Sequence, residues 1–414
     1  MNTRGLMVRN LWCLSGATAF PRLGVTTAGG WTLMVQDPAE GREVLLNRAR
    51  ELVPVLRERA PEAERLRRMP DETVENFHAG NFYRALQPAR YNGLELPFGV
   101  HTEFSVELAR GCASSSWHAI VIACHAWVGG MFPPNAQEEL WADDPTTLIS
   151  TSFRPDGVTV EREGVAIRIS GRWKFSSGVD NCTWAMLTLP VPPTSGGGRP
   201  EPYLALVPLA ECTVEDTWYA SGLAATGSND IVVEDLVVPA HRQLAFTAIR
   251  GGPSPGSVVN PSYIYQLPMY GMFSFNLVGC AIGAARGAIE ALIERIRNRD
   301  SITGAKIGEL TSAHLRIAES QSEIDAAMAL ILSNLDEINR LGSAGESHGL
   351  DDRLRYRRDN AFAAQLSVRA VDRIYPLLGG AGLASDDPIQ RSWRDVHAIA
   401  QHIALIWDLQ GGQW

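Results

Sequence analysis

The residues best suited to chemistry are two aromatics and two serines near the centre of the chain, in Gly171-Arg172-Trp173-Lys174-Phe175-Ser176-Ser177-Gly178. Aromatic side chains pack on flat rings, and hydroxyls form hydrogen bonds to ring heteroatoms. We therefore interpret Trp173, Phe175, Ser176 and Ser177 as candidates to hold a flat, polar cofactor. A plain β-turn accounts for the same Ser and Gly residues equally well.

Two histidines in apolar surroundings are further candidates for chemistry. His125 lies in an apolar helical run at 120–127, and His402 lies near Ile406 and Trp407 in a predicted helix. The reference pKa of an imidazole is about 6.5, so either ring can accept a proton near neutral pH. The structural alternatives are a hydrogen-bonded core histidine at 125 and a capped or surface histidine at 402.

Several common kinds of site are not predicted. The nine histidines show no His-x-x-x-His spacing and the six cysteines no Cys-x-x-Cys pair, so we expect no metal. No Gly-x-Gly-x-x-Gly follows an N-terminal strand, which argues against a Rossmann NAD site. Gly252-Pro253-Ser254-Pro255-Gly256 matches Gly-x-Ser-x-Gly. Its two prolines cannot form the strand-to-helix elbow of a hydrolase.

The composition indicates a globular protein. Apolar residues make up 45% of the 414 residues and charged residues 20%. The net charge of −9 argues against a nucleic-acid-binding protein, which needs a basic face. No apolar run reaches the length of about 18 residues that a membrane span needs. Scattered cysteines suit a reducing compartment, so we expect a cytoplasmic protein.

The hydrophobic periodicity changes twice along the chain and predicts an α+β fold. Helical spacing comes first, alternating strand patterns occupy the centre, and helical spacing returns from about residue 270. In the N-terminal part the predicted helices are 38–68, one that begins at 71, 99–111, 113–131 and 134–142. In the C-terminal part they are 278–296, 310–338, 359–378 and 392–409. The strands begin near Thr146 and end at Pro239.

These patterns divide the chain into four parts. Residues 1–37 form a leader that we expect to be poorly ordered, with Met34 as a plausible internal start. Residues 38–145 form an N-terminal helical domain. Residues 146–245 form a central antiparallel β-barrel or sandwich, with a flexible loop at 194–198. Residues 246–414 form a C-terminal four-helix bundle.

Four strings in this order resemble the acyl-CoA dehydrogenase superfamily over most of residues 38–414. The first is the central string with Ser176 and Ser177. The second runs from Thr226 through an acidic and apolar strand to Pro239, the third is Gly379-Gly380-Ala381-Gly382-Leu383, and the fourth is Arg394-Asp395. The resemblance implies that superfamily's fold: a helical domain, a β domain and a helical bundle.

One departure from this family is informative. Acyl-CoA dehydrogenases usually carry a catalytic glutamate about nine residues after the Arg of Arg-Asp, and here that register gives His402-Ile403-Ala404. Thioester dehydrogenation therefore lacks its usual base. The histidine is similar to that of the oxygenase components of two-component flavin-dependent aromatic monooxygenases. Residues 111–117, His125-Ala126-Trp127 and 131–133 also resemble their N-terminal domain.

The resemblance to these oxygenases implies reduced FMN or FAD from a separate reductase, O2 as co-substrate, and hydroxylation of a phenolic or polyketide-type aromatic through a C4a-hydroperoxyflavin. It implies catalytic roles for His402, His125 and Ser176. It assigns cofactor contacts to Trp173, Phe175, Ser176, Ser177, Ser152, Gly379, Gly380 and Arg394.

Other functions stay open from the sequence alone. These are an acyl-CoA dehydrogenase or related flavin oxidase, an N-oxygenase of an amine, and a non-catalytic flavin-binding member of the superfamily. The superfamily also implies a homotetramer in which phosphate contacts cross a subunit interface. No nucleic-acid or membrane partner is expected.

Overall fold

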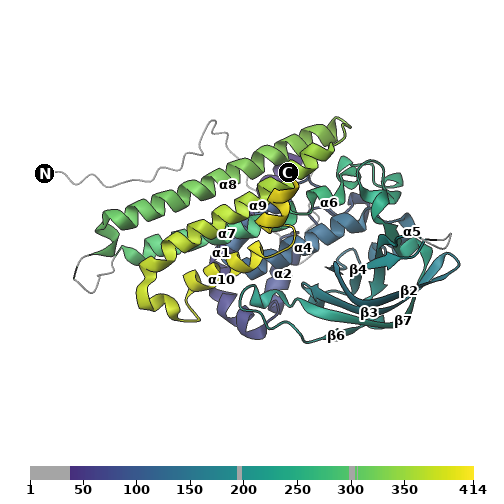
Figure 1. Cartoon of the computed structure of the whole chain (residues 1–414), viewed down its shortest axis with the longest axis horizontal. Coiled ribbons are helices and arrows are strands. Elements are labelled where there is room, and N and C mark those ends of the chain that lie inside the picture. The colour runs from purple at the N-terminus through teal and green to yellow at the C-terminus, as the bar shows by residue number, and fades with distance from the viewer. Residues whose placement is uncertain (1–37, 194–197, 298–303, 305) are drawn as a thin grey trace, which may run out of the picture. The chain divides into compact units, whose positions relative to one another are not determined.

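The computed structural model describes residues 38–193, 198–297, 304 and 306–414. The predicted leader, Met34 and residues 194–197 of the predicted loop lie outside these ranges. Helices come first along the chain, the strands follow, and long helices come last (Figure 1).

The N-terminal helices lie close to their predicted bounds. They are α1 (Pro38–Leu66), α2 (Asp71–Ala79), α3 (Val100–Ala109), α4 (Ala113–Gly129) and α5 (Pro134–Trp141). Pro54 lies inside α1, yet the helix continues through it without a break. Val53 and Leu56 are buried on either side of the proline, and their packing offsets the lost backbone hydrogen bond. In α4 every residue is buried.

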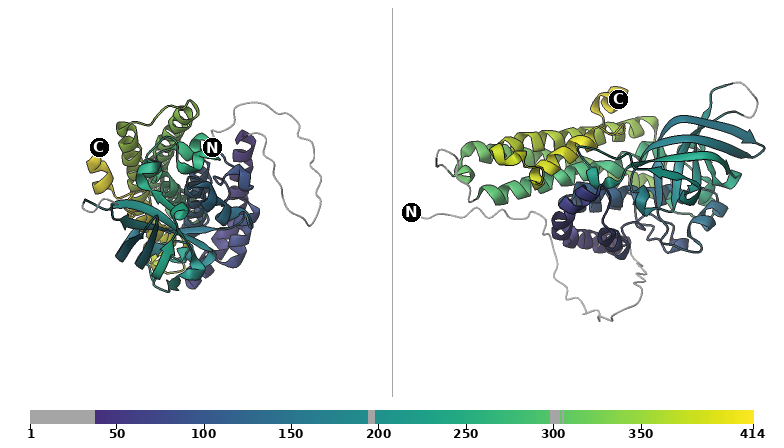
Figure 2. Two further views of the ribbon diagram at one scale, coloured as in Figure 1. Left: turned by 90° about the vertical axis from the view of Figure 1, so that its right-hand side faces the viewer. Right: turned by 90° about the horizontal axis from the view of Figure 1, so that it is seen from below.

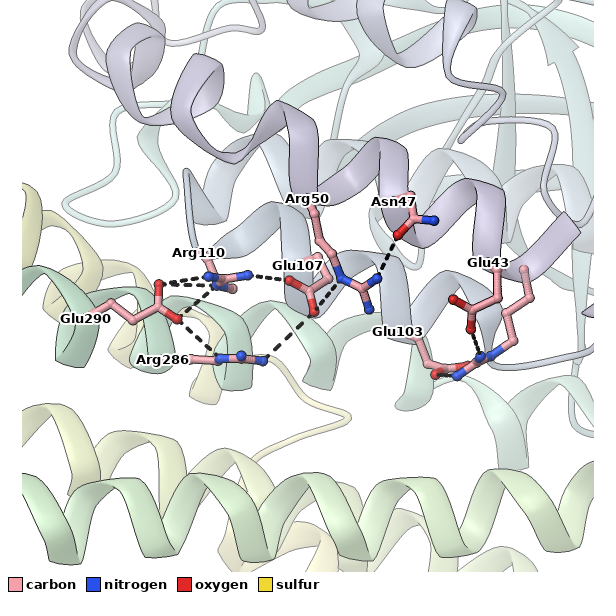
Figure 3. Close-up of polar contacts among 9 residues, drawn as sticks. Glu43, Asn47, Arg50, Glu103, Glu107, Arg110, Arg286 and Glu290 are labelled. Carbon is pink, nitrogen blue, oxygen red and sulfur yellow. Dashed lines mark hydrogen bonds and ion pairs between the residues drawn. The ribbon is translucent and has the colours of Figure 1, made fainter. Parts of the chain in front are cut away.

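A network of ion pairs ties α1 and α3 to the first long C-terminal helix, α7 (Phe275–Ile296), as Figure 3 shows. Glu107 of α3 is at its centre, with Arg110 Nη1 at 2.5 Å, Arg50 Nε at 3.6 Å and Arg286 Nη1 at 3.9 Å. Glu290 of α7 closes the network on Arg110 at 3.0 Å. The buried face of α3 thus has charged partners on both neighbouring helices.

The central strands form two four-stranded sheets with the orders β1-β4-β5-β8 and β2-β3-β7-β6. The strands are β1 (Ile149–Ser152), β2 (Arg154–Glu163), β3 (Ala166–Ser176), β4 (Trp184–Val191), β5 (Glu201–Pro208), β6 (Thr213–Glu215), β7 (Asn229–Val238) and β8 (Gln243–Ala245). Apolar side chains of β3 and β7 share one buried cluster with those of β4 and β5. The inner faces of the two sheets therefore pack on each other.

The prediction that all strands pair antiparallel was wrong in one place. β1 pairs with β4 in parallel, with Ile149 opposite Trp184. Because β1 leads at once into β2 of the other sheet, it lies at the sheet edge beside α4, whose Gly129 packs against Ile149. The short strands β6 and β8 were not predicted, since three residues carry too little periodicity.

The C-terminal part is built from four helices that pack against one another: α7, α8 (Thr311–Ser343), α9 (Leu350–Ile374) and α10 (Pro388–Ala400). Figures 1 and 2 show α7, α8 and α9 running side by side, with the two sheets near one of their ends. Two short helices, α6 (Met269–Met272) and α11 (Trp407–Gln410), precede and follow them. Predicted helix 359–378 begins earlier and ends earlier than expected.

The predicted last helix, 392–409, was wrong at its C-terminal end. Helix α10 stops at Ala400, and residues 401–406 form turns before α11. No Pro or Gly marks this break in the sequence. Within this turn Leu405 is completely buried, whereas Ile403 is exposed.

One stretch, Met269–Ile296, is long and apolar enough to span a membrane, but 89% of its apolar window is buried within the fold. That burial is typical of a core helix of a globular protein.

Candidate active site

Three side chains of the buried helix α4 form one row and are each slightly exposed. Trp117, Val121 and His125 follow one another at intervals of four residues, so they lie on one face. Their exposed fractions are 6%, 7% and 5%. Eight residues of helix separate Trp117 from His125, which is about 12 Å along the axis.

Aromatic rings from distant segments meet at the Trp117 end of this row. The ring of His402 lies 5.8 Å from that of Trp117 and 5.9 Å from that of Phe273. Phe273 in turn lies 4.9 Å from Phe153. These four rings come from α4, from the turn after α10, from the junction of α6 and α7, and from the end of β1. We call this group the aromatic cluster.

His402 is half-buried in this cluster, and burial lowers its pKa to about 4. Its Nδ1 accepts a hydrogen bond from the backbone N–H of Ala404 at 3.2 Å. The proton of the neutral ring therefore resides on Nε2. His402 presents an N–H donor to the site, where the sequence had predicted a base.

His125 has the opposite tautomer. Its Nδ1–H donates to the backbone carbonyl of Ile149 at 2.7 Å, because a carbonyl can only accept. Nε2 of the neutral ring is then a bare acceptor. Burial lowers the pKa of His125 to about 4. The backbone of β1 thus holds a neutral imidazole in the orientation that a proton acceptor needs.

The two serines of the central string differ in their partners. Ser177 Oγ accepts from Trp117 Nε1 at 3.1 Å and contacts Ser228 Oγ at 2.8 Å. Ser176 Oγ is buried and has no hydrogen-bond partner among the described residues. Thr151 Oγ1, on the same face of β1 as Ile149, is a second buried hydroxyl without one. Unpaired buried hydroxyls are costly, so a partner from a bound ligand suits both.

The prediction for Trp173 was wrong. Its ring is completely buried between the sheets, and its Nε1 donates to the carbonyl of Thr188 at 2.8 Å. No face is left for a cofactor ring. Phe175 is instead 56% exposed, and its positive φ of 64° reverses the alternation of β3. Ser152 Oγ donates to the carbonyl of Lys174 at 2.5 Å, so its hydroxyl proton is used in a hydrogen bond within the β domain.

The remaining predicted cofactor residues do not join this cluster within one chain. Gly379 and Gly380 are exposed in the 3-10 segment Tyr375–Leu383, which precedes α10, whereas His402 follows it. The 13 residues of α10 span about 20 Å. Arg394 forms an ion pair with Glu64 at 2.6 Å and donates to the carbonyl of Ser221. Its guanidinium is thus occupied by the protein itself.

His118, on the next face of α4, is a core histidine with both nitrogens paired. Tyr83 lies 3.1 Å from Nδ1 and Asn181 lies 3.2 Å from Nε2. Sequence analysis gave no role to Trp117, Phe153, Phe273 or Thr151. The available signal for Trp117 was its spacing of eight residues from His125, which places both on one face of a helix. Phe273 and Phe153 join through tertiary packing alone.

Known proteins share both the sequence and the fold. Residues 276–407 match the family model for the acyl-CoA dehydrogenase C-terminal domain. The oxygenase subunit HsaA of a flavin-dependent monooxygenase from Mycobacterium tuberculosis is 36% identical over 356 residues, which cover 85% of this chain and 89% of the relative. The oxygenase component of the FADH(2)-dependent resorcinol hydroxylase from Rhizobium sp. is 32% identical over 89% of this chain and 92% of the relative.

The crystal structure of HsaA from M. tuberculosis superposes with a TM-score of 0.84 at 33% identity, covering 90% of this chain and 96% of that one. The chain belongs to the oxygenase components of flavin-dependent monooxygenases. The acyl-CoA dehydrogenase-like fold inferred from the four strings is therefore confirmed, and so is the closer resemblance that His402 suggested.

Proposed function

We propose that this oxygenase component hydroxylates a phenolic aromatic compound with O2 and reduced flavin supplied by a separate reductase. The observation that carries this proposal is the aromatic cluster, in which His402 stands between Trp117 and Phe273. Family membership supports the reaction class, and the two neutral imidazoles of opposite tautomer, an acceptor at His125 and a donor at His402, suit a phenolic substrate.

The residues present fit a flavin. Ser176 Oγ and Thr151 Oγ1 are buried hydroxyls that lack a partner, and Ser177 Oγ lies beside the cluster. We expect Ser176 and Ser177 to hold the polar edge of the ring system. Bound reduced flavin supplies the activated oxygen atom. Every other contribution comes from the protein.

His125 is the proposed proton acceptor. Its Nε2 is bare, and its Nδ1–H is held by the carbonyl of Ile149. Taking the proton of a phenol raises the electron density of the ring at its ortho and para carbons. The resulting imidazolium is retained only while the phenolate stays beside it, because burial disfavours an unpaired charge.

His402 is the proposed donor. Its Nε2–H can bond a developing negative charge on substrate or oxygen, and preorganised donors of this kind typically contribute about 10²- to 10³-fold in rate. Trp117, Phe273 and Phe153 form apolar walls that orient an aromatic ring and limit water.

The acyl-CoA dehydrogenase alternative is disfavoured by the residues in contact with the cluster. Among the described hydrogen bonds and ring contacts of Trp117, Phe273 and His402, none involves a carboxylate. Abstraction of an α-proton from a thioester needs such a base. No contact favours N-oxygenation over phenol hydroxylation.

We also propose a cytoplasmic homotetramer whose central domain spans residues 146–245. The exposed glycine turn at Gly379 and Gly380 is then available to the flavin of a neighbouring subunit. Light scattering that gives the 45.1 kDa mass of one chain would contradict the assembly.

The test of the reaction is to mix the protein anaerobically with reduced FAD or FMN, add oxygenated buffer containing resorcinol or another simple phenol, and quantify hydroxylated product and peroxide. We expect product in excess of peroxide with at least one phenol. Direct reduction of bound flavin by an acyl-CoA, with no phenol hydroxylated, would favour a dehydrogenase.

A further inference from the structure

A chain of hydroxyl groups leads from the aromatic cluster into the β domain. Ser177 Oγ lies 2.8 Å from Ser228 Oγ, which lies 2.7 Å from Thr226 Oγ1. Thr226 Oγ1 lies 2.9 Å from the carbonyl oxygen of Leu223, which is the last group in this series of hydrogen bonds. Thr226 and Ser228 are 1% and 3% exposed, so water does not compete for these bonds. We call these three hydroxyls the hydroxyl relay.

The direction of every proton in the relay is fixed by its end. The Thr226 hydroxyl donates to the carbonyl of Leu223, which cannot donate and which also accepts the N–H of Thr226 at 3.1 Å. Thr226 then has no proton left for Ser228, so Ser228 donates to Thr226. By the same argument Ser177 donates to Ser228. Its oxygen meanwhile accepts the indole N–H of Trp117.

The consequence is a serine that cannot donate into the site. The hydroxyl proton of Ser177 is donated to Ser228, so Ser177 can offer only a lone pair to a ligand. Ser176 differs, because its hydroxyl has no partner and is free to donate. The two adjacent serines therefore present opposite hydrogen-bonding character.

The end of the relay is held firmly. Leu223 has a φ of 53°, and its N–H donates to the buried carboxylate of Asp395 at 2.6 Å. Its carbonyl also accepts Trp218 Nε1 at 3.0 Å. The N–H of Gly178 donates to the Thr226 carbonyl at 2.8 Å, which keeps the relay beside Ser177. A carbonyl fixed in this way cannot turn and reverse the relay.

We propose that the hydroxyl relay selects the redox state of the flavin, with Thr226 and Ser228 as positioning residues that never touch it. This inference rests on the proposed flavin site. Reduced isoalloxazine carries an N–H at N5, whereas the oxidised ring has a bare acceptor there. With N5 at Ser177, a lone pair bonds the reduced ring and repels the oxidised one.

The test is Thr226→Val, which keeps the shape of the side chain and removes the hydroxyl that fixes the relay. Ser228 can then donate to Ser177, and Ser177 is free to donate outward. We expect the ratio of the oxidised-FAD Kd to the reduced-FAD Kd to fall by about tenfold, the effect of one hydrogen bond. The midpoint potential of bound FAD then falls by about 30 mV, because tenfold equals that shift for a two-electron couple.

Two variants serve as controls. Thr226→Ser restores a hydroxyl and should restore the wild-type ratio. Thr188→Val removes a buried hydroxyl of the same β domain that has no hydrogen-bond partner and lies outside the relay, so its ratio should stay unchanged. Circular dichroism and thermal unfolding confirm that each variant is folded.

The outcomes separate this inference from the proposed function. If wild-type protein binds reduced FAD more tightly but Thr226→Val keeps the same ratio and potential, the relay has no selective role and the oxygenase assignment stands. An equal change in Thr188→Val would also overturn the inference, because the effect would be a general one of the β domain. If wild-type protein binds neither form of FAD or FMN, the proposed site itself is wrong.

Discussion

Replacing His125 by Asn isolates the role of its Nε2 atom. The amide of Asn can reproduce the Nδ1–H donation to the Ile149 carbonyl, which is 2.7 Å in length, but it has no group at the Nε2 position. The anchoring bond is thus preserved and the proton acceptor is lost. General-base contributions are typically about 10² to 10⁴, so we expect hydroxylation at pH 7 to slow by that factor.

The pH dependence gives the sharper signature. Because burial lowers the pKa of His125 to about 4, the wild-type ring is neutral above about pH 5, and the rate should be level from there to pH 9. The variant can hydroxylate only the fraction of the phenol that is already deprotonated in solution. With a phenol of pKa about 10, its rate should rise tenfold per pH unit toward pH 9.

The assay is single-turnover product formation with pre-reduced flavin, with peroxide measured beside it. His125→Gln is the matched control, since its longer amide reaches toward the Nε2 position and gives up the anchoring bond. If His125→Asn retains the wild-type rate at pH 7, His125 is a packing residue. A loss that does not recover with rising pH would mean that it orients the substrate and does not accept its proton.

Three further predictions follow from the described contacts. His402→Ala should keep flavin oxidation but lose product about 10²- to 10³-fold, with peroxide rising in proportion; unchanged coupling would remove His402 from the mechanism. Glu107→Gln should lower the free energy of unfolding, measured by urea denaturation, by about 1–3 kcal/mol, because Arg50, Arg110 and Arg286 lose their shared carboxylate. The control Glu43→Gln, which removes an exposed ion pair, should change it little. Burial lowers the pKa of His101 and His118 to about 4, so the unfolded chain binds more protons than the folded protein below pH 6.5, and the melting temperature should fall as pH drops from 6.5 to 4. Asp395, whose pKa burial raises to about 6, opposes this trend. A melting temperature that stays flat over that range would contradict the expectation that the histidines outweigh Asp395.

The order of elements could be predicted because long helices and alternating strands leave strong periodic signals. The helices α3, α4 and α5 lie within about two residues of their predicted bounds for this reason. The end of α10 could not be predicted. Residues 401–406 contain no Pro or Gly, and the turn bonds from the N–H groups of Leu405 and Ile406 to the carbonyl of His402 leave no periodic signal in the sequence.

The site was predictable only in part. The central string pointed to Ser176 and Ser177, but Trp173 and Phe175 stand two residues apart and a regular strand would place them on one face. The left-handed conformation of Phe175 sends its ring outward, while Trp173 faces the core. The tautomers of His125 and His402 depend on hydrogen bonds to the backbone groups of Ile149 and Ala404. For His125 the sequence does not show that the strand with Ile149 lies beside α4.

The proposed reaction uses reduced flavin and O2 at the aromatic cluster to hydroxylate a phenol. The most direct measurement is the incorporation of ¹⁸O from ¹⁸O2 into the phenolic product in a single turnover with pre-reduced flavin, followed by mass spectrometry. We expect one ¹⁸O atom per product molecule in the wild-type protein and little product in His125→Asn. Product without the label, or equal labelled product from both proteins, would contradict it.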